Sequence, residues 1–378
     1  MREAVSEHGV GEHGAADRLS RRLRAASVES LALGAGGVAF VAVGLVAFFV
    51  FAGHDLSISG AGSVGQFAAI ACCVVTLVVY GGGRVATWSI PWYRRPKEHR
   101  SRIGAAIEVF DSLAIAVAHA VVVLLLWTVL SDVLARSFQD AQVFAIPATL
   151  LVGTAAAVTG YYVFLAAANM NPLLLSAVLA VFLVVGALTS MLTASNPHWW
   201  KQNLSVLGIT DDWSSATFNI TVIVGGVLVT AIARYATDSG SDRRPSRGEL
   251  QVRTALVIVG AMLACVGLFP VNRFFLLHNT AATGMAVVFC LLAIGIRWAM
   301  PQLPRAFYAL GWVFIGVIAL VALFFAVGYY NLTAVELVAA VLIFSWIIVF
   351  LRVSVAAGSD VRDEARGDGS AVTPRRPA

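Results

Sequence analysis

The chain has 378 residues, of which 59% are hydrophobic and only 12% are charged, and its mean hydropathy is +0.83. Soluble domains carry about 25% charged residues, so this composition excludes an ordinary soluble enzyme and equally excludes a disordered protein. The formal net charge of +5 would suit a nucleic-acid binder, so the positions of the basic residues have to be considered as well.

Ten apolar runs follow one another along the chain, and each is about as long as a helix that crosses ~30 Å of hydrocarbon. They lie at about 31–52, 66–83, 105–130, 143–167, 173–194, 216–236, 254–270, 274–296, 306–328 and 333–351. The sequence therefore predicts an all-α fold, a polytopic transmembrane helical bundle with ten spans.

The basic residues are distributed very unevenly between the two sides that ten spans define. If the N-terminus is cytoplasmic, 23 of the 26 Lys and Arg residues face the cytoplasm, and only Arg136, Lys201 and Arg273 lie outside. This is the positive-inside bias of membrane proteins, so the net charge reflects topology and predicts no nucleic-acid partner. We expect a multi-pass protein of the cell inner (plasma) membrane, in contact with the lipid bilayer, with both termini in the cytoplasm.

Two groups of short motifs stand out in the C-terminal half. They are Asn196 to Trp200, Asn203, Ser205, Leu207, Gly208, Phe218 and Asn219, and then Gly267 to Pro270, His278 and Phe289. On these residues the segment from about 173 to 352 resembles a family of six-span prokaryotic membrane proteins, Domain of Unknown Function 998. The resemblance implies a six-helix unit and no established activity. A fainter similarity connects the Phe-Pro and His patterns to eukaryotic six-span proteins of the Frag/DRAM/Sfk type, which are associated with lipid distribution and membrane trafficking.

The resemblance begins just after a short polar connection, and this suggests how the chain is divided. We predict a four-span N-terminal unit at 30–168 and a six-span unit of unknown function at 173–352. The flanking segments 1–29 and 353–378 are polar and are predicted to be disordered cytoplasmic tails.

Three ionisable residues lie within the third apolar run, where a charge costs roughly 2.5 to 3.5 kcal/mol on insertion scales. At 100° per residue, Glu108, Asp111 and His119 fall within an arc of about 80° and form one polar stripe. One hypothesis is a coupling stripe that relays protons or cations from the cytoplasm. The alternative is structural, with the carboxylates paired to loop arginines such as Arg102 and the histidine bonded to a neighbouring helix.

A denser polar cluster is expected at the outer ends of the last six spans. Asn203 lies in the longest outer loop, and Asn219 lies one turn into the sixth span. Arg273 begins the eighth span, His278 lies about a turn and a half deeper, and Glu336 lies one turn into the tenth. We expect Arg273 to pair with Glu336, because a guanidinium can hold a carboxylate and still face a phosphate. The cluster is either a ligand-binding site or a set of bonds between helices, and its convergence requires spans six, eight and ten to adjoin.

Sequence motifs for catalysis are weak throughout the chain. No span contains more than one His, and no HExxH, GxSxG, Walker or GxGxxG motif occurs in its structural context. An acid–base pair of Glu336 and His278 leaves an enzyme open, but we predict no catalytic residue, no metal site and no cofactor.

Three functions remain open from the sequence. The first is non-enzymatic binding of a lipid or small amphiphile at the outer face, the second is secondary transport through the coupling stripe, and the third is a structural or assembly subunit. The oligomeric state is not predicted.

Overall fold

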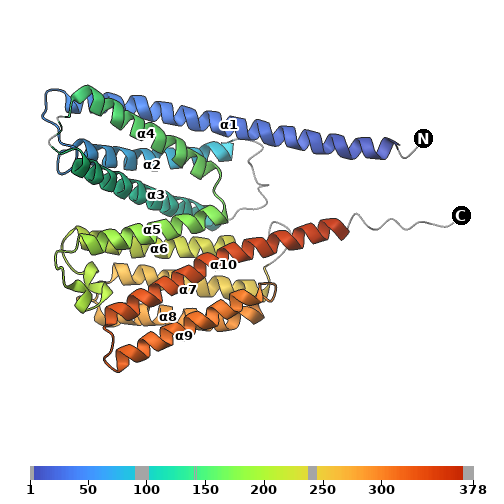
Figure 1. Ribbon diagram of the computed structural model, residues 1–378. Coiled ribbons are helices and arrows are strands. Elements are labelled where there is room, and N and C mark those ends of the chain that lie inside the picture. Colours follow the sequence, from blue (N-terminus) through green and yellow to red (C-terminus); the bar gives the residue numbers. More distant parts are fainter. Residues whose placement is uncertain (1–3, 90–101, 140, 142, 237–244, 369–378) are drawn as a thin grey trace. The chain divides into compact units, whose positions relative to one another are not determined.

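The computed structural model describes residues 4–89, 102–139, 141, 143–236 and 245–368, and every regular element in this part of the chain is helical (Figure 1). The elements are α1 (Ala4–Phe51), α2 (Val64–Ser89), α3 (Arg102–Ser137), α4 (Ala145–Ala168), α5 (Pro172–Leu192), α6 (Trp213–Ala236), α7 (Arg247–Leu268), α8 (Phe275–Ala299), α9 (Arg305–Ala326) and α10 (Leu332–Asp368), with the short 3₁₀ helices η2 (Trp199–Lys201) and η3 (Leu204–Gly208) between α5 and α6. The all-α prediction is confirmed.

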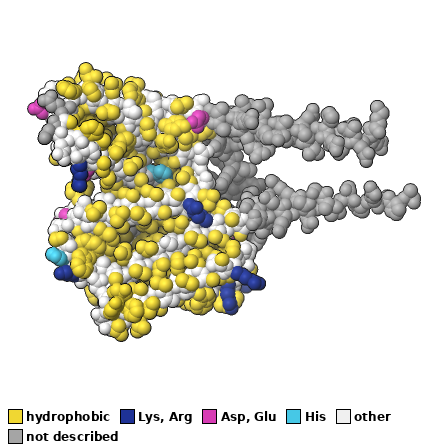
Figure 2. Space-filling view, viewed as in Figure 1, with side chains coloured by type: hydrophobic (Ala, Val, Ile, Leu, Met, Phe, Trp, Pro, Cys, Tyr) yellow, Lys and Arg dark blue, Asp and Glu magenta, His cyan; other side chains and the backbone are white. Residues whose placement is uncertain are grey.

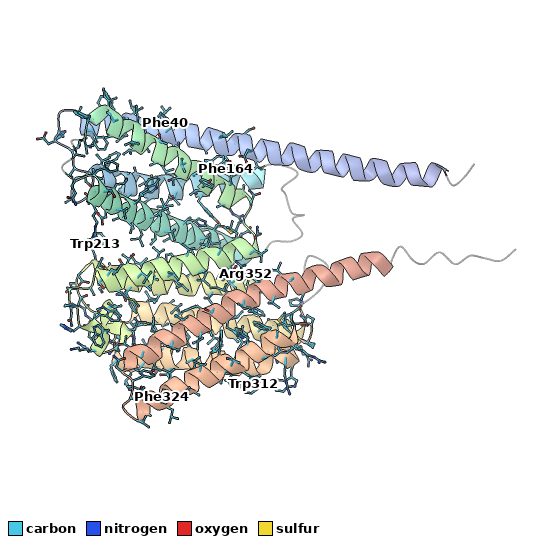
Figure 3. The ribbon with its side chains drawn as sticks, in the orientation of Figure 1. Phe40, Phe164, Trp213, Trp312, Phe324 and Arg352 are labelled. Carbon is cyan, nitrogen blue, oxygen red and sulfur yellow. The ribbon has the colours of Figure 1, made fainter. Side chains whose placement is uncertain are left out.

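All ten α-helices of the described residues contain an apolar stretch of 20 to 34 residues, long enough to cross a bilayer. The ten predicted spans are therefore confirmed by length and composition. Large apolar side chains are exposed along these stretches, such as Val38 of α1 and Trp312 of α9, which is labelled in Figure 3. Hydrophobic side chains cover most of the described surface that Figure 2 displays, as expected for a protein surrounded by lipid.

Both terminal helices are longer than the apolar runs that they contain. α1 begins at Ala4 and α10 ends at Asp368, so residues 4–29 and 353–368 are helical where the composition predicts disordered tails. Helix propagation adds one hydrogen bond for each further residue without a new nucleation step, so a stable span can extend into its polar flank.

The chain divides into two compact units. Unit 1 comprises Met1–Ala105 and His119–Met170, and unit 2 comprises Ala106–Ala118 and Asn171–Ala378. The turns of α3 at 106–118 therefore group with the six C-terminal helices rather than with the first four. Independent folding of a four-span and a six-span unit stays a prediction.

Unit 1 is built around α4, on which both α1 and α2 pack. A Cβ atom on Gly36 of α1 would lie 2.8 Å from the Ala157 carbonyl oxygen, and one on Gly153 of α4 would lie 3.2 Å from the ring of Phe40 (Figure 3). Such small residues allow helices to approach closely where no hydrophobic effect drives them together.

Unit 2 combines close helix contacts at glycines with an aromatic core. α6 and α7 meet at Gly226 and Gly260, where a Cβ on the first glycine would lie 2.3 Å from the carbonyl oxygen of the second. Trp346 of α10 is fully buried, stacks on Phe350 and contacts Phe307 of α9 and Phe289 of α8. These contacts fix the helices whose opposite ends carry the predicted cluster.

Candidate functional site

The long loop, residues 193–212, joins α5 to α6 and contains both 3₁₀ helices. Its segment η3 begins at an N-cap, since the Asn203 side chain accepts a hydrogen bond from the Val206 amide at 3.0 Å. This cap satisfies one amide locally, and three further polar groups of the segment are bound by side chains from other helices.

Three spans each supply one side chain to this five-residue segment. The Glu336 carboxylate of α10 accepts a hydrogen bond from the Leu204 amide, and Nε2 of His278 in α8 lies 2.8 Å from the Ser205 hydroxyl. Nδ2 of Asn219 in α6 donates to the Gly208 carbonyl at 3.0 Å. Spans six, eight and ten therefore adjoin at this end of unit 2, and four of the five predicted cluster residues meet at η3.

His278 is buried and uses both ring nitrogens. Its Nδ1 lies 2.8 Å from the Phe269 carbonyl oxygen, which can only accept, so Nδ1 carries a proton. In the neutral tautomer, Nε2 then accepts from the Ser205 hydroxyl. The ring joins the end of α7 to η3, a connecting role that needs no ligand.

The Asn219 side chain is only partly satisfied. Its Nδ2 is bonded, but its Oδ1 is buried without a hydrogen-bond partner among the described residues. A Cβ on Gly208 would lie 2.7 Å from this oxygen, so only glycine allows η3 to approach α6 so closely. The hydroxyl of Thr333 in α10 is a second buried polar group that has no hydrogen bond to any residue that the structure describes.

Arg273 does not join the cluster in the way that the sequence predicts. The expected ion pair with Glu336 is not formed: the Glu336 carboxylate accepts from the Leu204 amide, and the Arg273 side chain is exposed. The four residues that follow, Phe274 to Leu277, are also exposed, with relative accessibilities between 45% and 79%. A cation beside apolar side chains therefore lies at the start of α8.

Further polar contacts hold the rest of the long loop. Nδ2 of Asn331 donates to the Trp200 carbonyl at 2.8 Å and so fixes η2. Ser190 of α5 and Ser214 of α6 are bonded to one another across the loop's two ends. The sequence does not predict this serine pair, because serines in apolar helices usually form hydrogen bonds to the backbone of their own helix.

The predicted coupling stripe is divided between the two units. Asp111 is buried and forms an ion pair with Arg234 at the end of α6, with a second bond from Arg234 Nε to Oδ2 at 2.9 Å. The His119 ring, in unit 1, lies 5.4 Å from the ring of Tyr80. Glu108 is half-buried, and the Arg102 side chain, the suggested partner, lies outside the described residues. The Asp111 pair favours a structural role over proton coupling.

Metal binding finds no support among the described residues, where no three His, Cys, Asp or Glu side chains come together as a metal site would require. Cys72, Cys73, Cys265 and Cys290 are all free, and Cys72 is buried. We assign no metal site.

Asp212 is the N-cap of α6 and the basis of a pH-dependence prediction. Hydrogen bonds from the Thr210 hydroxyl and the Ser215 amide lower the pKa of this carboxyl from 3.8 to about 2. A carboxyl group whose pKa is lower in the folded state than in the unfolded state stabilises the protein at pH values above its unfolded-state pKa. This stabilisation is lost as the pH falls through the folded-state pKa. Asp212→Ala should cost about 1 kcal/mol at neutral pH, and the difference from wild type should shrink between about pH 4 and pH 2.

Thermal unfolding of wild type and Asp212→Ala across this pH range measures the effect, with the exposed neighbour Asp211 replaced by Ala as the control. A constant difference between wild type and Asp212→Ala over the whole range would contradict the capping role.

The contacts of His278 lead to a second prediction, which concerns how firmly the long loop is held in place. His278→Ala removes the bonds to Ser205 and Phe269, at a cost of roughly 1 to 3 kcal/mol. Amide hydrogen exchange in η3, measured by mass spectrometry, should become faster. Asn331→Ala is the control, because it releases η2 instead and should leave exchange in η3 nearly unchanged. Unchanged exchange of η3 in His278→Ala would show that the ring does not hold this segment.

The ten apolar helices and the polar contacts at their ends define a polytopic helical membrane protein. Residues 175–353, which span nearly all of α5 through the apolar part of α10, match the model of the family described as protein of unknown function (DUF998). This confirms the resemblance of the C-terminal half, and all five predicted cluster residues fall within the matched segment. No match was found among curated proteins or among solved structures.

Proposed function

We propose that the end of unit 2 that carries the long loop binds an anionic lipid headgroup or a small anionic amphiphile, and that it does so without catalysing a reaction. The observation that carries the proposal is the exposed Arg273 side chain, which forms no ion pair with Glu336 and is followed by four exposed apolar residues.

The chemistry of this surface suits an amphiphile with a phosphate. A guanidinium can bind two phosphate oxygens at once. Phe275 and Leu276, the most exposed of the four apolar residues that follow Arg273, offer contacts for hydrocarbon. Glu336 accepts from the Leu204 amide and forms no ion pair with Arg273, so the guanidinium is available to an anionic ligand. The Asn203, Asn219 and His278 contacts hold the adjacent η3 in place, so that this surface is largely formed before a ligand arrives.

The proposal requires this end of unit 2 to face the outside of the plasma membrane. The support is the charge bias of the sequence, which predicts that 23 of the 26 basic residues lie on the opposite, cytoplasmic side. In a background without the four native cysteines, Lys201→Cys should label from outside the cell and Gln302→Cys only after the membrane is opened. Both positions are exposed. Labelling of both from the same side would overturn this topology.

Lipid retention tests the binding itself. The protein is purified in mild detergent, and the anionic and zwitterionic phospholipids that remain bound are quantified by mass spectrometry. Arg273→Ala should lower the anionic fraction about fivefold, since a basic residue near the membrane surface contributes ~1 kcal/mol towards anionic lipid. Arg136→Ala is the control, since this exposed arginine lies on the same predicted side but in unit 1. Wild-type retention by Arg273→Ala would overturn the proposal.

A further inference from the structure

A second feature suited to lipid lies at the opposite end of unit 2, between α7 and α8. The two helices enclose an open groove of about 670 Å³. Its walls are apolar over most of their length, with Ala255 and Ile258 on α7 and Val288, Leu291 and Gly295 on α8. Arg273 lies just before the start of α8, whereas the groove lies along the last three turns of that helix, so the two surfaces are separate.

The groove exists because of how glycines are placed in the two helices. At the end of the groove that carries Arg247, a Cβ on Gly248 of α7 would lie 1.9 Å from the Ala299 carbonyl oxygen, so the helices are in backbone contact there. Farther along, a Cβ on Gly284 would lie 2.9 Å from the terminal methyl of Met262. Between these two contacts, Gly295 has no atom within 4 Å of an added Cβ, so small residues leave the space open.

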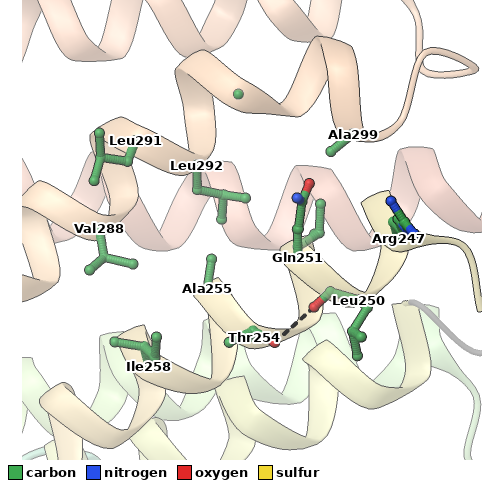
Figure 4. Close-up of a pocket in the computed structure, with 12 residues that line it drawn as sticks. Arg247, Leu250, Gln251, Thr254, Ala255, Ile258, Val288, Leu291, Leu292 and Ala299 are labelled. Carbon is green, nitrogen blue, oxygen red and sulfur yellow. Dashed lines mark hydrogen bonds between the residues drawn. The ribbon is translucent and has the colours of Figure 1, made fainter.

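The polarity of the groove changes along its length. Arg247 and Gln251, one helical turn apart, are both exposed and line one end, whereas Ile258, Val288 and Leu291 line the other (Figure 4). The Thr254 hydroxyl lies between them and is already bonded to the Leu250 carbonyl at 2.8 Å. Arg247 to Ile258 spans about 16 Å of helix, at 1.5 Å per residue.

The charge of the lining selects among possible occupants. Arg247 is the one charged residue in the lining of this groove, which contains no carboxylate, and no described residue forms an ion pair with it. Glu249, two residues away, is occupied in the capping box with Ser246. A cation at one end of an otherwise apolar groove, inside a helix pair long enough to span the bilayer, matches the charge and polarity of an anionic phospholipid.

We propose that the α7–α8 groove binds one anionic phospholipid, with its phosphate at Arg247 and Gln251 and an acyl chain along Ala255, Ile258 and Leu291. The guanidinium and the side-chain amide donate hydrogen bonds to the phosphate and glycerol-ester oxygens. The acyl chain fills a volume that hydrocarbon, rather than water, would occupy at this depth. The site recognises a lipid and not free phosphate, because only one charged group is present and most of the contact is apolar.

Photo-crosslinking in nanodiscs of the full-length protein tests the proposal. Phosphatidylglycerol with a photoreactive group in its acyl chain is the probe, phosphatidylcholine with the same chain is the comparison, and crosslinked peptides are located by mass spectrometry. The phosphatidylglycerol probe should crosslink to 250–258 and 288–295 more strongly than the phosphatidylcholine probe.

Variants at two positions separate the contribution of the headgroup from that of the acyl chain. Arg247→Ala should reduce the phosphatidylglycerol crosslinks in the groove about fivefold, to the level of phosphatidylcholine, and Arg247→Lys should restore part of the loss. Gly295→Leu should abolish crosslinks of both probes by filling the groove. The controls are Arg305→Ala, an exposed arginine at the same end of unit 2, and Gly316→Leu, a glycine of α9 with equally open space around it.

Several results would overturn the proposal. They are equal crosslinking of the two probes in wild type, crosslinks that persist in Gly295→Leu, or displacement of the probe by inorganic phosphate alone at millimolar concentration. Should Gly295→Leu not fold, the Arg247 variants still decide the result through the difference between the two probes. Arg273→Ala should leave these crosslinks unchanged, so failure of the outer-face proposal can be distinguished from failure of this one.

Discussion

Replacing Asp111 by Ala is expected to lower the stability of the protein by about 3 kcal/mol, one of the two largest effects that the structure predicts. Removing one partner of a buried ion pair leaves the other charge uncompensated, which costs about 3 to 5 kcal/mol. We expect the lower end of this range because Arg234 is not fully buried: the relative accessibility of its side chain is 23%, compared with 9% for Asp111. The measurement is the unfolding temperature in detergent, together with the amount of protein that is inserted.

A double variant distinguishes a charge effect from a loss of packing. Asp111→Leu and Arg234→Met together remove both charges, so the double variant should recover most of the stability that either single change loses. Asp132→Asn is the control on the same helix, since Asp132 is exposed. Equal stability of wild type and Asp111→Ala would show that the pair is not structural and would revive the coupling hypothesis for Glu108, Asp111 and His119.

Gly226→Ala is the second change with a large expected effect, about 3 kcal/mol, the upper end for overpacking a close contact. The added methyl would lie 2.3 Å from the Gly260 carbonyl oxygen and 2.7 Å from the Ala264 amide nitrogen. Both are backbone atoms, so no side chain can rotate away and α6 and α7 have to separate. Gly260→Ala should have a similar effect, because its methyl would lie 2.5 Å from the Gly226 carbonyl oxygen.

Thermal unfolding by fluorescence-detected size exclusion gives the comparison. Gly316→Ala of α9 is the matched control, since an added methyl there meets no atom within 4 Å and should not destabilise the protein. If Gly226→Ala and Gly316→Ala unfold at the same temperature, α6 and α7 do not form the close contact described here.

The cluster at η3 illustrates how far a sequence can predict a site inside a membrane. A polar side chain in an apolar helix must find a partner, because leaving it unsatisfied in hydrocarbon costs several kcal/mol. This rule picks out Asn219, His278 and Glu336 as residues that need partners, and the structure brings all three to one loop segment. Their functional role remains a proposal, since the contacts seen are those of a structural cluster.

The identity of the partners could not be predicted in the same way. Glu336 binds the Leu204 amide and not Arg273, and Asp111 binds Arg234, which is 123 residues away. Every residue except proline has the same backbone N–H, so an amide that acts as a donor leaves no mark in the sequence. Long-range pairs depend on how each helix is rotated about its axis.

The number and approximate positions of the spans were determined by the sequence alone, whereas several helix ends lie some residues away from the ends of the apolar runs. The cost of exposing a backbone to hydrocarbon makes each apolar run of about 20 residues a helix, whatever surrounds it. The tertiary structure decided which faces meet. Gly226 lies against Gly260 and Gly248 against Ala299, whereas Gly295 and Gly316 face open space, although all are glycines within apolar helices. In lipid the hydrophobic effect does not distinguish one apolar face from another, so helix pairing depends on close packing and a few polar bonds, which only the assembled helices reveal.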